Sequence, residues 1–173
     1  KSEADTINGY TTGQVVLNSA SMTVTELAAV EALNDSVMKF ADDGAISVSD
    51  AASLSDANTI NNYTTGQVTL TSVDDTVANI TSIDGLTTTQ VSMAAATVSI
   101  ADTGASKTQV DTVNGFTTGT VTPTSISEDK ADITTLQGTA GISLATTNIT
   151  VTDQVDKSEA DTINGYTTGQ VVL

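Results

Sequence analysis

The chain has 173 residues, of which 21 are acidic, 5 are lysine and 34 are threonine, and its formal net charge at pH 7 is −16. It contains no histidine, cysteine or arginine. This composition excludes Ser–His and Cys–His nucleophilic triads, ordinary zinc sites, disulfides and binding to nucleic-acid phosphates. No run of about 18 apolar residues is present that could span a membrane.

An internal repeat dominates the sequence. Residues 157–173 are identical to residues 1–17, so the chain holds one period of 156 residues and the first 17 residues of another. The motif INGYTTGQV at residue 7 returns in related form at residues 60, 113 and 163, with weaker copies between them. We therefore expect a slice of a longer tandem array. The expected divisions are one period over 1–156, made of double units 7–59, 60–112 and 113–162, and the start of the next identical period over 157–173.

A two-turn helix is predicted in every unit. Each ends near an apolar anchor residue, with a second apolar residue three positions earlier, which is the spacing of one helical face. N-cap residues stand seven positions before most anchors. Gly, Asn or Asp follows the anchors, where it ends the helix. The anchors are Ile7, Leu33, Ile60, Ile83, Val113, Leu136 and Ile163, and the predicted N-caps are Glu26, Ser53, Thr76, Ser106, Asp129 and Asp156.

Short strands are predicted on both sides of the helices, because apolar residues alternate there with Ser or Thr. They are expected at residues 15–17, 22–24, 46–48, 68–70, 91–93, 98–100, 121–123 and 149–151. Pro123 has no N–H to donate and is expected at a strand end or a bulge. Strands and short helices that alternate in register predict parallel sheets with right-handed crossovers.

The predicted fold is an α/β repeat, a parallel αβ-solenoid in which units of ~26 residues pair into double units of ~52 residues. Such units are too small to bury a core alone and must stack. Tandem β-sandwich domains are the alternative, although sandwiches have few helix caps. The pattern leaves open whether one turn of the solenoid contains ~26 or ~52 residues.

An amide or acid follows every anchor, where the chain leaves the helix. We expect these side chains to form a structural ladder, at least partly buried and hydrogen-bonded to the main chain, because buried polar groups need partners. The ladder positions are Asn8, Asn34, Asn61, Asp84, Asn114, Gln137 and Asn164.

Calcium is the one metal for which candidate ligands exist. The acidic pairs Asp42-Asp43 and Asp74-Asp75 offer carboxylate oxygens, the ligands that calcium prefers. Neither an EF-hand loop nor the glycine-rich nonapeptide of calcium-binding β-rolls is present. The simpler interpretation is that acids cap helices and keep the protein soluble. No catalytic residue and no cofactor is predicted, since no pocket-forming insertion interrupts the repeat.

The phrases I/L-N-x-x-TTG-x-V, strongest at residues 7–15, 60–68, 113–121 and 163–171, resemble the degenerate repeats of very large surface proteins of aquatic bacteria, cyanobacteria especially. The resemblance implies a giant extracellular or cell-surface protein with an adhesion, biofilm-matrix or filament role and no defined chemistry. We expect a non-enzymatic repeat module that stacks into a filament or stalk and whose partner is itself, along the chain and between neighbouring filaments. The alternative is an adhesin whose solenoid face or loops bind calcium, glycan or a surface.

Overall fold

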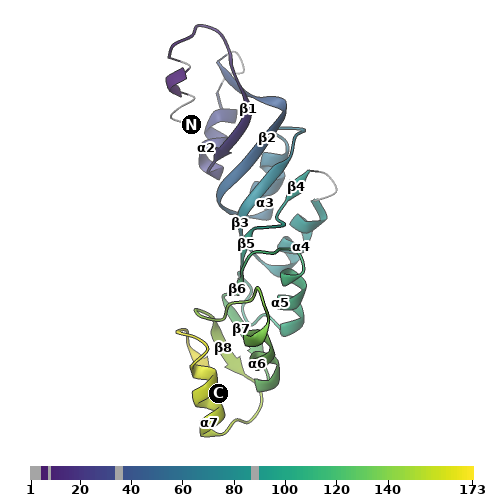
Figure 1. Cartoon of the computed structure of the whole chain (residues 1–173), viewed down its shortest axis with the longest axis vertical. Coiled ribbons are helices and arrows are strands. Elements are labelled where there is room, and N and C mark those ends of the chain that lie inside the picture. Colours follow the sequence, from purple (N-terminus) through teal and green to yellow (C-terminus); the bar gives the residue numbers. More distant parts are fainter. Residues whose placement is uncertain (1–4, 8, 34–36, 87–89) are drawn as a thin grey trace. The chain divides into compact units, whose positions relative to one another are not determined.

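The computed structural model describes residues 5–7, 9–33, 37–86 and 90–173. They belong to two compact units: unit 1 is Lys1–Ser72 with Ser82–Met93, and unit 2 is Val73–Thr81 with Ala94–Leu173. Figure 1 labels the elements except β9. They are β1 (Val15–Met22), α2 (Val24–Glu31), β2 (Met38–Ala52), α3 (Leu54–Asn61), β3 (Val68–Asp75), α4 (Val77–Gly85), β4 (Val91–Ser92), β5 (Thr97–Ile100), α5 (Lys107–Asn114), β6 (Val121–Pro123), β7 (Ser125–Glu128), α6 (Lys130–Gly138), β8 (Asn148–Val151), α7 (Lys157–Asn164) and β9 (Val171–Val172).

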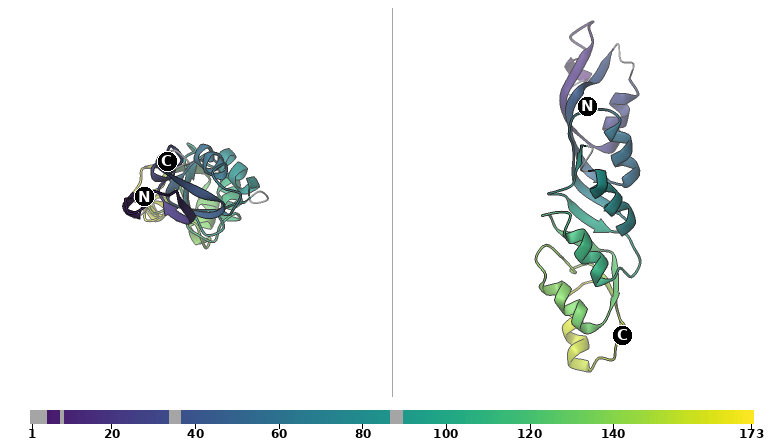
Figure 2. Two further views of the ribbon diagram at one scale, coloured as in Figure 1. Left: turned by 90° about the horizontal axis from the view of Figure 1, so that it is seen from above. Right: turned by 90° about the vertical axis from the view of Figure 1, so that its right-hand side faces the viewer.

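In unit 1, helices pack on one side of a parallel sheet. Strand β1 pairs with β2 from Val15 opposite Met38 to Met22 opposite Val48, with an irregularity between Leu17 and Ser19. The first part of β3 follows next to β2 and pairs in parallel with β4. Helix α2 packs against β1, β2 and α3, and the right-hand view of Figure 2 shows both helices on the same side of the strands.

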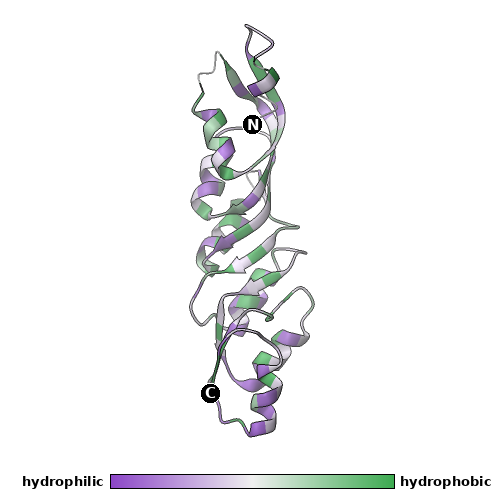
Figure 3. Cartoon of the chain, turned by 90° about the vertical axis from the view of Figure 1, so that its left-hand side faces the viewer, coloured by the Kyte–Doolittle hydropathy of each residue, from purple (hydrophilic) through white to green (hydrophobic). Residues whose placement is uncertain are grey.

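The core of unit 1 follows from two periodicities. Along β2 the buried residues alternate with more exposed ones, as the period of a strand requires. On the helices, residues three positions apart face these strands, and Leu27 and Val30 of α2 are fully buried. Figure 3 shows the resulting alternation of hydrophobic and hydrophilic residues along strands and helices. Helices α2 and α3 have eight residues each, too few to be stable in water without this packing.

In unit 2, helices again pack against parallel strands. Strand β5 pairs with β6, with Val98 opposite Val121. Strands β7, β8 and β9 form a separate parallel sheet in that order, with Ile149 opposite Val171. Helix α5 packs against α6, and α6 packs against α7. The protein is therefore an α/β fold with mainly parallel sheets, and the described residues form no closed barrel.

Most predicted helices begin where the sequence places them. Ser53, Ser106, Asp129 and Asp156 each accept the backbone N–H three residues later, as N-caps do. The anchors Ile60, Ile83, Val113, Leu136 and Ile163 are buried, as predicted. Pro123 is the last residue of β6, which confirms its expected place at a strand end.

The helix predicted around Leu33 is wrong by one helical turn. Its N-cap is Thr23 rather than Glu26, and the two residues form a capping box in which each side chain bonds the other's backbone N–H. Leu27 and Val30 then occupy the buried face, whereas Leu33 lies beyond the helix and is half-buried. The strand predicted over residues 22–24 consequently ends at Met22.

The helices begin at alternating long and short intervals along the chain. Helices α2 to α7 begin at residues 24, 54, 77, 107, 130 and 157, at intervals of 30, 23, 30, 23 and 27 residues. A long and a short interval together produce the 53-residue spacing of the motif in the sequence. The pairings of β1 with β2, β3 with β4, β5 with β6, β7 with β8 and β8 with β9 are all parallel. With helices packed on mainly parallel sheets, the alternative of tandem β-sandwich domains is wrong. No helix within the described ranges is both long and apolar enough to cross a bilayer.

Candidate functional site

The TTG motif forms the same clasp at residues 64–66, 117–119 and 167–169. In each, the hydroxyl of the first threonine donates to a backbone carbonyl 20 or 21 residues earlier and accepts the N–H of the glycine. The donations are Thr64 to Gly44 (2.6 Å), Thr117 to Ala96 (2.7 Å) and Thr167 to Thr147 (2.7 Å), and the glycine N–H bonds measure 2.8, 2.9 and 2.8 Å in the same order. We call these three motifs the TTG clasps.

The second threonine of a clasp adds two further hydrogen bonds, both to one backbone carbonyl. In the middle copy, the N–H of Thr118 donates to the carbonyl of Ala94 at 2.8 Å, and its hydroxyl donates to the same oxygen at 3.0 Å. The other two clasps repeat this arrangement with Asp42 and Ala145 as acceptors. Each clasp therefore ties a turn to a segment 20 to 24 residues earlier through side chain and main chain together.

The glycine of the clasp is required by close approach of two backbone segments. A Cβ atom at Gly119 would lie 2.1 Å from the carbonyl oxygen of Ala96. At Gly66 and Gly169 the nearest backbone oxygen would be 2.4 Å away. No side chain fits at such a distance, so the motif ends in glycine for a steric reason.

A second recurring contact joins helix N-termini to acids further along the chain. The N–H of a helix's first residue has no partner within the helix and favours a negative charge. Four such N–H groups donate to carboxylates 21 to 26 residues later: Val24 to Asp50 (2.9 Å), Val77 to Asp102 (2.6 Å), Lys107 to Glu128 (2.5 Å) and Lys130 to Asp153 (3.0 Å). The sequence analysis missed these caps, although each acid stands one to four residues before the N-cap of the next helix.

The residues of the predicted ladder differ in burial and in hydrogen bonding. Asn114 donates from its amide to the carbonyl of Ala140 at 3.2 Å, which is the kind of bond that the ladder requires. Asn61 and Asp84 are also half-buried, and the Oδ1 atom of Asn61 is buried with no partner among the described residues. Gln137 and Asn164 are exposed. Asn8 and Asn34 lie outside the described residues, and the ladder as a whole stays a prediction.

The candidate calcium ligands do not form a site in the described part of the chain. Asp42, Asp43 and Asp74 are exposed, and a carboxylate oxygen of Asp42 lies 3.6 Å from Lys39 Nζ. Asp75 accepts the N–H of Thr76 at 2.8 Å, so its carboxylate acts at the start of α4. No group of three or more acids that could hold a metal ion occurs within residues 5–7, 9–33, 37–86 and 90–173. Calcium binding remains a prediction without a site.

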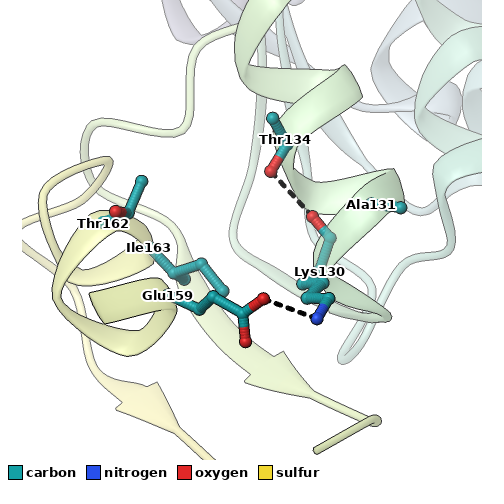
Figure 4. Close-up of a pocket in the computed structure, with 6 residues that line it drawn as sticks. All are labelled: Lys130, Ala131, Thr134, Glu159, Thr162 and Ile163. Atoms are coloured by element: carbon teal, nitrogen blue, oxygen red, sulfur yellow. Dashed lines mark hydrogen bonds and ion pairs between the residues drawn. The ribbon is translucent and has the colours of Figure 1, made fainter. Parts of the chain in front are cut away.

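A shallow and mainly apolar groove lies between α6 and α7 in unit 2. It has a volume of about 460 Å³, and its lining residues in Figure 4 are Lys130, Ala131, Thr134, Glu159, Thr162 and Ile163. Lys130 Nζ lies 2.6 Å from Glu159 Oε1 across it. This hydrogen bond raises the pKa of Lys130 and, with a backbone bond at Asp156, lowers the pKa of Glu159. The pair joins two neighbouring helices.

A second recess, in unit 1, is more polar. Its volume is about 390 Å³, and it is lined by Asp42, Asn61, Asn62, Tyr63, Thr64, Thr65 and Gln90. The ring of Tyr63 stacks on Phe40 with centroids 6.0 Å apart, and burial is the main cause that raises the pKa of Tyr63. Asn61, whose Oδ1 atom is buried without a partner among the described residues, is one of the lining residues.

No protein-family model matches this chain, and no curated protein or solved structure matches it either. Function therefore has to be argued from the recurring contacts themselves.

Proposed function

We propose that this chain is a structural repeat module of a very long secreted protein, in which strand–helix units of ~26 residues stack as a parallel αβ-solenoid. The module extends an extracellular filament or stalk and catalyses no reaction. The observation that carries the proposal is the TTG clasp, because the same bonds recur at residues 64–66, 117–119 and 167–169 and connect each repeat to the preceding one.

The acid caps support the same proposal. They bridge one helix to the segment before the next helix, so that clasps and caps bond each repeat to its neighbours along the chain. The threonine and acidic side chains of these contacts all bond to backbone groups. The resemblance of the TTG phrases to repeats of giant bacterial surface proteins agrees with this role.

The net charge of the chain determines under which conditions such filaments would associate side by side. Residues 1–156 contain 19 acids and 4 lysines, a net charge of −15 for one period. Parallel filaments of this charge repel each other, and dissolved salt screens the repulsion beyond about 8 Å at physiological ionic strength. Lateral bundling would then require salt or divalent cations.

Immunogold electron microscopy of the cells that produce the protein tests the proposal. An antibody raised against the 173-residue chain should label fibres outside the cell at many points along their length. Label confined to the cytoplasm would refute the extracellular role, and label restricted to fibre tips would favour an adhesive head over a filament body.

A binding module is the second candidate, and the polar recess of unit 1 is the observation that favours it. Asp42 and Asn61 both line this recess, and the Oδ1 atom of Asn61 is buried with no partner among the described residues. Titration calorimetry with calcium is the test, since extracellular modules bind calcium with dissociation constants of about 10⁻⁴ to 10⁻³ M. Heat that disappears in Asn61→Ala and persists in Asp74→Asn would support binding in this recess. If no heat is measured, the binding module is refuted and only the structural role remains.

A further inference from the structure

An asparagine at the end of α5 is followed by a glycine, a pair that can react without any partner protein. Asn114 is the last residue of α5, and Gly115 is its C-cap. In such a pair the backbone nitrogen of the glycine can attack the side-chain amide carbon of the asparagine, because glycine has no side chain to hinder the approach. Whether the reaction takes place depends on the bonds that the two residues make in the folded chain.

Both reacting groups are bonded to other parts of the folded chain. The N–H of Gly115 donates to the carbonyls of Asp111 and Thr112 at 3.1 Å each, which completes the end of the helix. The side-chain amide nitrogen of Asn114 donates to the carbonyl of Ala140 at 3.2 Å. Attack requires the glycine nitrogen to leave its two carbonyls and the backbone of Asn114 to leave its helical conformation. The closed helix end therefore protects Asn114, and local opening exposes it.

We infer that Asn114 is a site of spontaneous deamidation, and that opening of the C-terminal end of α5 controls its rate. The nitrogen of Gly115 forms a bond to the side-chain carbonyl carbon of Asn114. The proton of this nitrogen and the side-chain NH₂ group leave together as ammonia, and a five-membered succinimide ring remains. Water then opens the ring at either of its two carbonyls, which produces aspartate or isoaspartate at position 114. Water is the only co-reactant.

The product does not fit the contacts that the asparagine makes. A carboxylate has no N–H to donate, so the carbonyl of Ala140 loses its bond and faces a negative charge. This charge lies at the C-terminal end of a helix, where the helix dipole disfavours it. The space is also small, since a Cβ atom at Gly141 would lie 2.6 Å from Oδ1 of Asn114. The reaction therefore weakens the end of α5 permanently in chains where this end has opened.

Deamidation also changes the net charge of the chain. Each event adds one negative charge to a protein whose net charge is already −16. In the tandem array that we propose, the same asparagine recurs every 156 residues, so an old filament would carry more charge than a new one and would associate less readily with its neighbours. Only this consequence rests on the proposed function. Cytoplasmic labelling in the immunogold experiment would remove the filament and leave the reaction at Asn114 unaffected.

Mass spectrometry of the whole 173-residue chain tests the inference. The protein is incubated in mildly alkaline buffer with and without urea and is then digested with trypsin. The peptide of residues 108–130 contains Asn114 as its sole asparagine, so conversion of an amide to an acid in this peptide reports that residue. Conversion should be at least about tenfold faster in urea, because the unfolded chain holds none of the protecting bonds. Equal rates, or no conversion in urea, would overturn the inference.

A substitution beside the reacting carbon tests the chemistry in the unfolded chain, where a change in folding has no influence. Gly115→Ala adds a methyl group next to the attacking nitrogen and should slow the conversion in urea. An unchanged rate would show that the glycine nitrogen is not the attacking group.

A variant that imitates the product tests the structural consequence. Asn114→Asp should lower the urea midpoint of unfolding. The control is Asn62→Asp, because Asn62 is the C-cap of α3 and is exposed, so this variant adds the same charge at the end of another helix. A larger decrease for Asn114→Asp would support the loss of the bond to Ala140. Equal midpoints for the two variants would refute the claim that deamidation weakens α5.

Discussion

Replacing Thr117 by valine removes one TTG clasp while it keeps the shape of the side chain. The hydroxyl of Thr117 is buried, donates to the carbonyl of Ala96 at 2.7 Å and accepts the N–H of Gly119 at 2.9 Å. Valine can do neither. The change therefore leaves the carbonyl of Ala96 and the N–H of Gly119 without their partner.

The cost can be worked out from the burial of these two groups. A buried polar group left unpaired costs about 1–3 kcal/mol. The bond to Ala96 is buried, whereas the bond from Gly119 is only partly buried, so water replaces part of the second. We expect Thr117→Val to lower the free energy of unfolding by about 2–4 kcal/mol.

The neighbouring threonine provides a matched control. Thr118 is exposed, and the carbonyl of Ala94 that its hydroxyl contacts also accepts the N–H of Thr118 at 2.8 Å. Thr118→Val therefore leaves no group unpaired and should cost no more than about 0.5 kcal/mol. Urea unfolding followed by far-UV circular dichroism measures both variants, and hydrogen exchange at Gly119 reports the local effect. If the two valine variants are equally stable, the clasp does not hold the repeats together.

Three further predictions follow from the same contacts. Gly119→Ala should destabilise the protein by more than about 3 kcal/mol, because its Cβ would overlap a backbone oxygen, whereas Gly138→Ala, with nothing within 4 Å, should be neutral or stabilising; thermal unfolding distinguishes them. Asp102→Ala removes the partner of the first N–H of α4 and should cost about 1 kcal/mol in urea unfolding; an unchanged midpoint would show that water replaces the carboxylate. The ion pair of Lys130 and Glu159 should stabilise the folded chain between two pH limits. The stabilisation is lost in acid as the pH falls through the lowered pKa of Glu159, and in alkali as the pH rises through the raised pKa of Lys130. In Glu159→Gln, the free energy of unfolding measured across pH should lose both dependences.

Local features of the fold follow from the sequence because their causes lie within a few residues. A cap such as Ser106 and the N–H that it accepts are three positions apart, and the buried pair Val110 and Val113 lies on the same helix. The error around Leu33 shows the limit of this reasoning. Leu27, Val30 and Leu33 offer two overlapping pairs with the same spacing, and the capping box of Thr23 selects the earlier pair.

The period of 156 residues, most N-caps, the alternation along the strands and the expectation of parallel pairing can all be derived from the residues alone. The bonding partners of the TTG threonines and of the acids before each helix become apparent only in the folded chain. Thr117 and Ala96 are 21 residues apart, and Val77 and Asp102 are 25 residues apart. Contacts at such separations depend on the register in which successive repeats pack, and that register is the sum of many side-chain contacts that no local pattern encodes.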